Sequence, residues 1–336
     1  MIKESYEMKR SFIKAFTALA CTLAIACTAG AANPNRQIDR LARNIWKGSI
    51  DNMTRDRLYA MYRMQDYMDS LSSDTFNAYL KADEQTRREM EKGTVLRYYQ
   101  IVLDKLVREI PRTRVEKGTV AIWHLYNMGY VVKTPSQCFA VDIKHPEASR
   151  LVPFLDFLLI THKHGDHFTD AMNKAMTDAG KPVFANWESD SYPLTNLKDT
   201  RELQVGGIKV RTALTDHNAK LQNFVITYLV DCGEDTDHTV FYLTGDTNNT
   251  EQVNPGCPVD IFIPHILVGL DVPKAAEQVD PCWMFSSHLH ELGHKLTLWR
   301  WSYFDGLDIS HETHRRNVFV PCWGDKVVYR RSAVVR

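Results

Sequence analysis

One segment of the chain, residues 161–167, concentrates side chains that could do chemistry. It reads Thr-His-Lys-His-Gly-Asp-His, and it brings together His162, His164, Asp166 and His167. Neutral imidazole and carboxylate groups are ligands for zinc and similar divalent ions. The spacing predicts a loop, because ligands on one helix face lie three or four residues apart and a strand puts only alternate side chains on one side.

The ligand-type residues of this loop form two pairs. His162 and His164 could hold one metal ion, and Asp166 and His167 could turn toward a second ion close by. The apolar run before them, residues 155–160, predicts a short buried strand, so the cluster lies where a strand ends. The alternative is a polar loop that is rich in histidine by chance, and this density of ligand types argues against it.

Three further candidates, His217, Asp246 and His288, each follow a later predicted strand. Gly245, directly before Asp246, lets the backbone turn so that the carboxylate points out at the strand end. Taken singly, a histidine or aspartate at a strand end is more often a solvated or capping residue. The order of the whole set along the chain is what indicates a metal site.

The ordered set resembles the metallo-β-lactamase superfamily, in particular the branch of ascorbate-6-phosphate lactonase and N-acyl-phosphatidylethanolamine phospholipase D. The opening strands and Asp142 also resemble the start of that family's domain, and the resemblance covers residues 118–330. It implies an α/β fold: a four-layer αβ/βα sandwich with the metals at one end, between the sheets. An all-helical region precedes this domain.

The family's pattern implies two divalent metal ions and their ligands. The first ion would be held by His162, His164 and His217, the second by Asp166, His167 and His288, with Asp246 bridging both. Zinc is the expected ion, and the same nitrogen and oxygen ligands suit manganese or iron. We expect a bridging hydroxide to attack a carbonyl carbon or a phosphorus, with Asp166 and Asp246 as the catalytic carboxylates that orient it.

The last ligand has two competitors in the sequence, His265 and His290. His265 is also a candidate for substrate contact, as is Asn127, although a predicted turn explains Asn127 equally well. No cluster of arginine and lysine marks a phosphate pocket. Ester, lactone, amide and phosphodiester bonds therefore all stay open, in a small-molecule or lipid-like substrate.

Residues 290–294 read His-Glu-Leu-Gly-His, a zincin metalloprotease motif in which two histidines on one helical turn bind zinc and Glu291 acts as base. That alternative leaves the 161–167 loop and Asp246 unexplained. The other interpretation gives Glu291 and His294 a supporting role behind His288. A third alternative is a non-catalytic metal-binding module of the same fold, but the presence of all seven ligand types favours a metal-dependent hydrolase.

Bulk composition excludes some classes of protein. The 336 residues are 44% hydrophobic and 24% charged with a formal net charge of +0, so no basic surface indicates a nucleic-acid partner. The cysteines show no CxxC pair, so a cysteine zinc site is not supported.

The N-terminus has the pattern of a secretory signal peptide over residues 1–32. Met8-Lys9-Arg10 is positive, residues 12–26 are mostly apolar, and residues 29–32 are small. We expect an exported protein, periplasmic or secreted, with a lipid anchor on Cys27 as the alternative. The apolar run is shorter than a bilayer span, and no later segment predicts a transmembrane helix.

The remaining chain divides by pattern into two parts. Residues 33–117 predict a helical extension, because apolar residues recur at helical spacing, as in Leu96, Tyr99, Leu103 and Leu106. Residues 118–336 predict the hydrolase domain, with many short strands and few helices, which favours two sheets with helices outside.

Overall fold

The computed structural model describes residues 34–266 and 269–331, so the predicted signal peptide at 1–32 lies outside the described residues. The described chain begins with the predicted helical region. Its helices are α2 (Pro34–Lys47), α3 (Arg55–Ser70), α4 (Ser73–Lys81), α5 (Glu84–Met90) and α6 (Val95–Glu109). Thr54, Ser72 and Asp83 start α3, α4 and α5 by accepting a backbone N–H, as good N-cap residues do.

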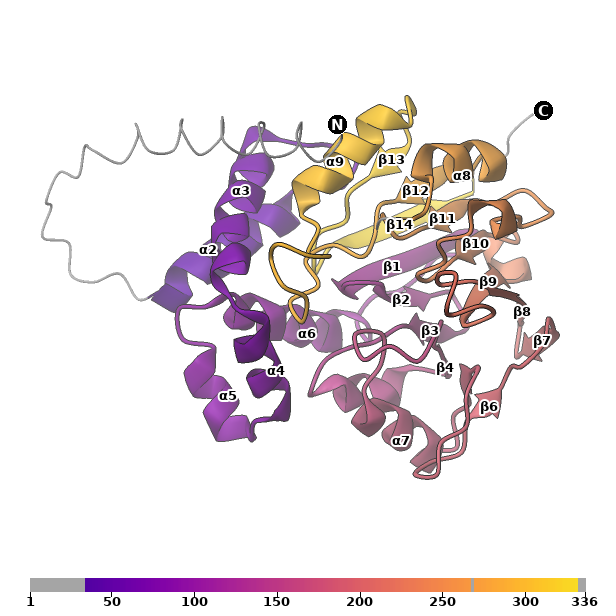
Figure 1. Ribbon diagram of the computed structural model, residues 1–336, viewed down its shortest axis with the longest axis horizontal. Coiled ribbons are helices and arrows are strands. Elements are labelled where there is room, and N and C mark those ends of the chain that lie inside the picture. The colour runs from indigo at the N-terminus through magenta and orange to yellow at the C-terminus, as the bar shows by residue number, and fades with distance from the viewer. Residues whose placement is uncertain (1–33, 267–268, 332–336) are drawn as a thin grey trace, which may run out of the picture. The chain divides into compact units, whose positions relative to one another are not determined.

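Two seven-stranded sheets follow. Figure 1 shows how their labelled strands are arranged. In sheet order the first contains β14 (Lys326–Arg330), β1 (Thr119–Tyr126), β2 (Gly129–Lys133), β3 (Cys138–Val141), β4 (Phe157–Leu159), β5 (Val183–Ala185) and β6 (Thr195–Asn196). The second contains β13 (Val318–Phe319), β12 (Trp283–Phe285), β11 (Ile261–Ile263), β10 (Val240–Leu243), β9 (Val225–Asp231), β8 (Ile208–Thr215) and β7 (Glu202–Val205).

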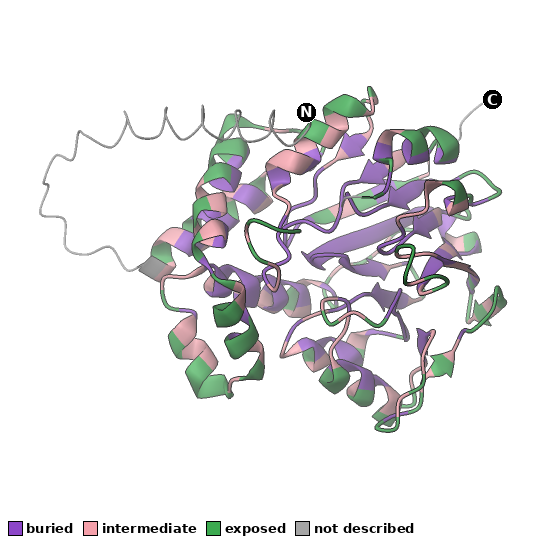
Figure 2. Cartoon of the chain, viewed as in Figure 1, coloured by how far each residue is buried: buried purple, intermediate pink, exposed green. Residues whose placement is uncertain are grey.

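The sheets pack face to face, and helices cover their outer faces. The core between them draws on both sheets, with Phe139 and Phe157 from the first and Phe241 and Phe285 from the second. Helix α7 (Asp170–Asp178) lies on the first sheet, and α8 (Val272–Val279) and α9 (Tyr303–Glu312) lie on the second. Figure 2 shows the strands buried and the helices exposed on one side. The predicted four-layer sandwich is therefore confirmed.

The helical region and the sandwich belong to one unit that starts at Pro34. Arg57 of α3 donates from Nη1 and Nη2 to the two carboxylate oxygens of Asp325, at 2.9 and 2.5 Å, and both side chains are buried. Tyr98 and Trp46 both donate to the carbonyl oxygen of Trp323. These contacts fix the helices to the segment that leads into β14.

Strand direction brings several loops to one end of the sandwich. Strands β8 and β10 both run antiparallel to β9, and β11 and β12 run parallel to β10, so β8, β10 and β12 end at the same edge. In the other sheet β1 and β3 run antiparallel to β2, and β4 runs parallel to β3. The amide of Ile226 donates to the carbonyl of Thr161 at 2.7 Å and links the two sheets at this end.

Across the described ranges, no helix combines the length and the apolar character that a membrane crossing requires.

Candidate metal centre

The seven predicted ligands come together at this end of the sandwich, in two clusters that share one carboxylate. The first cluster is His162, His164, His217 and Asp246, and the second is Asp166, His167, Asp246 and His288. In each cluster the ligand atoms lie within 4.8 Å of one another. The residues come from the loops after β4, β8, β10 and β12, as the strand directions require.

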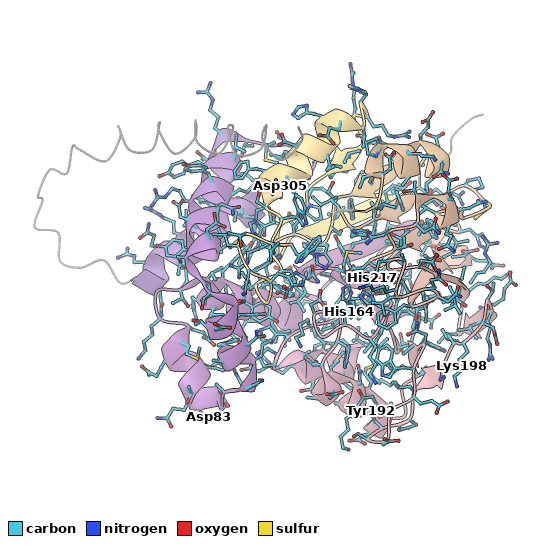
Figure 3. All side chains as sticks on the ribbon, viewed as in Figure 1. Asp83, His164, Tyr192, Lys198, His217 and Asp305 are labelled. Atoms are coloured by element: carbon cyan, nitrogen blue, oxygen red, sulfur yellow. The ribbon has the colours of Figure 1, made fainter. Side chains whose placement is uncertain are left out.

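In the first cluster, imidazole nitrogens converge on one point. His162 Nε2 lies 3.0 Å from His164 Nδ1, and Asp246 Oδ2 lies 3.8 Å from His162 Nε2 and 3.9 Å from His217 Nε2. Figure 3 labels His164 and His217, whose ring centroids are 4.7 Å apart. The His217 side chain is 17% exposed, whereas that of His162 is fully buried, so the first cluster reaches solvent on the His217 side.

In the second cluster, two carboxylates face two imidazoles. His288 Nε2 lies 3.2 Å from both Asp166 Oδ2 and Asp246 Oδ2. His167 Nε2 lies 3.2 Å from Asp166 Oδ2 and 3.4 Å from Asp246 Oδ1. Asn127 Nδ2 donates to Asp166 Oδ2 at 3.0 Å, so this predicted substrate-side residue lies beside the second cluster and holds one of its carboxylates.

Gly245 lets the chain turn at the end of β10, as predicted. Its φ is +52°, in the left-handed region, and an added Cβ would lie 2.7 Å from Thr161 Cβ and 2.9 Å from Val225 Cγ1. A side chain is thus excluded both by conformation and by space. This turn directs the Asp246 carboxylate between the two clusters.

The two clusters differ in electrostatics. Burial, with a contribution from nearby His167, lowers the pKa of His162 well below its usual value, so His162 is neutral. Burial alone would lower the pKa of His288, but Asp246 and Asp166 raise it to about 10. Burial would likewise raise the pKa of Asp246, but His288 and His167 hold it well below its usual value.

These properties fit a divalent metal ion. The second cluster holds a buried carboxylate, Asp246, and a half-buried one, Asp166, whose charges are balanced by the imidazoles of His167 and His288. A cation would take over that role. His167 Nε2 and Asp246 Oδ1 are buried and lack an aligned hydrogen-bond partner among the described residues. The donor set of imidazole nitrogen and carboxylate oxygen suits zinc, manganese or iron.

Asp142, absent from the predicted site residues, supports the second cluster. Its Oδ2 lies 2.9 Å from His167 Nδ1, and it accepts hydrogen bonds from the amide and hydroxyl of Thr161 at 2.8 and 2.7 Å. The side chain is fully buried. The available signal was its place directly after β3, a strand parallel to β4. Such a carboxylate fixes the ring orientation of a ligating histidine.

The two competitors of His288 lie outside both clusters. His265 Nε2 lies 2.5 Å from the carbonyl oxygen of Thr247, so His265 supports the turn that carries Asp246. His290 Nε2 accepts the backbone N–H of Tyr303 at 3.1 Å and is buried.

The zincin alternative is wrong. Residues 290–294 form a turn and no helix, so the two histidines of the motif do not share a helical face. His290 points to Tyr303, whereas His294 lies beside His288, with ring centroids 6.0 Å apart and an interplanar angle of 18°. His294 therefore lies beside the second cluster, and Glu291 lies next to His294, with Oε2 3.2 Å from its Nδ1.

Comparisons with known proteins agree with this fold. No protein-family model matches the chain. A metal-dependent hydrolase of Rubrobacter xylanophilus is 36% identical over 84 residues, which are 23% of this chain and 34% of that protein. The chain thus spans about a third of the length of this curated relative.

Among solved structures, a metallo hydrolase of Ignicoccus hospitalis is similar with a TM-score of 0.50 and 15% identity, over 64% of this chain and 100% of that one. A metallo-β-lactamase fold protein of Bacillus subtilis has a TM-score of 0.48 and 13% identity, over 63% of this chain and 100% of that one. At 15% identity, the similarity to the Ignicoccus hospitalis structure supports the fold and says nothing about activity.

Proposed function

We propose that this chain, which has the metallo-β-lactamase fold, is a metal-dependent hydrolase with a dinuclear site. The observation that carries the proposal is the position of Asp246. Its carboxylate belongs to both ligand clusters, so one side chain would bridge two metal ions. The name of the similar Rubrobacter protein supports the hydrolase class.

The ligands divide as the clusters do. His162, His164 and His217 would hold one ion, Asp166, His167 and His288 the other, and Asp246 both. Zinc suits this set best because most of the ligands are imidazoles, and manganese or iron would also fit. When bound, two such ions supply a nucleophile derived from water at neutral pH and polarise the bond that is cleaved.

The chain's own residues then position and protect the reacting groups. Asn127 orients the Asp166 carboxylate by donating to Oδ2, and Asp142 orients His167. Asp166 and Asp246 are the carboxylates that would align an attacking water and accept its proton. Phe224 packs against the rings of His164 and His217, at centroid distances of 5.0 and 6.2 Å, and so helps to hold both rings in place.

The substrate is proposed only by class, as a small or lipid-like molecule with an ester, lactone, amide or phosphodiester bond. The predicted export of the protein stays a prediction.

A panel of chromogenic substrates tests the function. We expect zinc-loaded protein to hydrolyse at least one of p-nitrophenyl acetate, a chromogenic lactone, nitrocefin and bis-p-nitrophenyl phosphate, and a chelator to abolish the reaction. His164→Ala and Asp246→Ala should abolish it too, whereas His311→Ala, which changes an exposed histidine of α9, should not. Hydrolysis that survives Asp246→Ala and chelation would refute the proposal. A protein that binds metal and cleaves nothing in the panel would favour the non-catalytic module.

A further inference from the structure

The segment after β12 carries an imidazole that no metal cluster uses. His294 lies next to the second cluster, its ring parallel to that of His288, and its side chain is 37% exposed. Its Nδ1 atom is buried and lies 3.2 Å from Glu291 Oε2. Among the described residues, no hydrogen bond to Nε2 is present, so the exposed edge of the ring is the one that remains available.

Glu291 lies against this ring and is itself held by several hydrogen bonds. It is 3% exposed, and its Oε1 accepts hydrogen bonds from the Tyr126 hydroxyl and the Gly293 amide, both at 2.9 Å. Its Oε2 accepts the amide of His294. The Tyr126 hydroxyl in turn accepts the amide of Leu292 at 2.7 Å. Both carboxylate oxygens are occupied by these donors, so the backbone at residues 292–294 is fixed and the His294 ring lies against Glu291.

Arg300 ties the same segment to the helical region. Its guanidinium is buried, and Nε and Nη2 donate to the carbonyl of His294 at 3.0 and 2.6 Å, with Nη2 also donating to that of Leu292. Nη1 donates to the carbonyls of Met68 and Leu71 at 3.0 and 2.7 Å.

These two carbonyls belong to the C-terminal end of α3, where unpaired carbonyls and the helix dipole favour a cation. All five N–H donors of the arginine are thereby used, and a lysine has only three. The helical region also supports Tyr126, because Tyr99 of α6 and Phe76 of α4 pack on its ring at centroid distances of 5.0 and 5.8 Å.

We propose that His294 contacts the substrate beside the second metal position, and that the helical region holds it there through Arg300. The inference rests on the proposed hydrolase function. His294 would touch the bound substrate, whereas Arg300 is a positioning residue that acts through the backbone of residues 292–294. The helical region would thus be part of the working site, although it supplies no metal ligand.

The first test replaces the ring nitrogens. His294→Phe keeps a planar ring next to His288 and removes both nitrogens, and His294→Gln restores a polar group. We expect His294→Phe to lower kcat/KM for the best chromogenic substrate by about 10- to 100-fold, the size of one hydrogen bond to a charged group. Zinc content should not change, and His294→Gln should recover part of the loss. The control is His311→Phe, at an exposed position of α9.

A binding measurement accompanies the kinetics. The probe is inorganic phosphate, titrated calorimetrically into the zinc-loaded full chain. His294→Phe should weaken phosphate binding by about tenfold relative to the unmodified protein and to His311→Phe. Equal phosphate affinity and equal kcat/KM in His294→Phe would overturn the inference. If Asp246→Ala were still inactive, the hydrolase proposal would stand without it.

The second test asks whether Arg300 acts through His294. Arg300→Met should lower kcat/KM as His294→Phe does, and in the His294→Phe background it should add little, because coupled residues are non-additive. Arg43→Met, at an exposed position of α2, is the control. If Arg300→Met fails to fold, Arg300→Lys carries the same comparison. Additive losses in the double variant would show that Arg300 acts on the whole fold and would refute the positioning role.

Discussion

At the scale of single residues, Asp246 is the side chain that both ligand clusters share. Its Oδ1 faces His167, while its Oδ2 faces His162, His217 and His288. The carboxylate is 3% exposed, and nearby imidazoles hold its pKa well below the usual value despite burial. A buried anion of this kind is stable only when positive groups or metal ions lie next to it. Asp246 has such neighbours in both clusters.

Asp142 gives a prediction at the same scale. Asp142→Asn removes the charge that orients His167 but keeps the size of the side chain. Loss of such a supporting carboxylate typically weakens metal binding by about 10- to 100-fold. Competition with a chromogenic zinc chelator measures this change. Asp199→Asn, at an exposed position, should bind zinc like the unmodified protein, and equal affinity in Asp142→Asn would contradict the supporting role.

Residue types and their order were enough to select seven ligand-type side chains, because imidazole and carboxylate chemistry is local to each residue. The structure brings these seven together in two clusters, and that they bind metal stays a prediction. The choice among His288, His265 and His290 was open in the sequence because each of the three follows a predicted strand closely. The structure places only His288 among the ligands. The three rings differ in the groups that they face. His288 Nε2 faces Asp166 and Asp246, whereas His265 Nε2 faces the Thr247 carbonyl and His290 Nε2 accepts the Tyr303 amide. These partners lie far away in the sequence, so the local pattern does not reveal them.

At the scale of elements, the turn after β10 gives a steric prediction. Gly245→Ala forces a side chain into a position 2.7 Å from Thr161 Cβ and imposes a φ of +52° on alanine. Strain and overpacking together should lower the free energy of unfolding by at least about 2 kcal/mol. Denaturant unfolding measures this.

Gly180→Ala is the matched control for this turn. Gly180 also has a positive φ, +70°, but nothing lies within 4 Å of the added Cβ. It should therefore cost only about 1 kcal/mol, the conformational part of the penalty. Equal losses in the two variants would show that the contact with Thr161 does not matter.

Most elements around the site were predictable, because each ligand loop follows an apolar run that reads as a strand. The short strands β6, β7 and β13 were not predicted, and neither was β14, which pairs with β1. Strands β6 and β13 have two residues each, and β7 is partly exposed along its length, so none has a clear hydrophobic pattern. The zincin alternative arose for a related reason, since five residues do not show whether they form a helix or a turn.

At the scale of the whole molecule, the sequence predicts a helical region that packs on the main domain or shapes a cleft, but not the contacts that attach it to the sandwich. The Arg57–Asp325 pair joins residues 268 positions apart, and the local sequence around either residue does not predict this contact. The same holds for Arg300 and the carbonyl oxygens of α3. Long-range polar contacts between buried groups depend on packing that sequence patterns do not encode.

Buried histidines away from the metal centre predict how the stability of the molecule depends on pH. Burial lowers the pKa of both His145 and His290 to about 3. Each accepts a backbone N–H, from Glu147 and Tyr303 respectively, so the folded protein keeps them neutral. The unfolded chain takes up these protons below its ordinary pKa of about 6.5. Stability is therefore full above that pH and falls as pH drops toward 3, by about 1.4 kcal/mol per pH unit for each histidine.

Denaturant unfolding of metal-free protein at pH 7.5 and 5.0 measures this dependence. His145→Asn together with His290→Gln retains an acceptor near each nitrogen and removes the titration. We expect the double variant to lose clearly less stability between the two pH values than the unmodified protein. The same loss in both proteins would contradict this explanation of the acid sensitivity.

The central claim is that Asp246 joins two metal positions in one site, and metal stoichiometry tests it most directly. Full-length protein saturated with zinc and freed of excess metal is analysed by mass spectrometry of the metal content. We expect about two zinc ions per chain, and a clear loss from both positions in Asp246→Ala. A content below one ion per chain in the unmodified protein, or an unchanged content in Asp246→Ala, would contradict it.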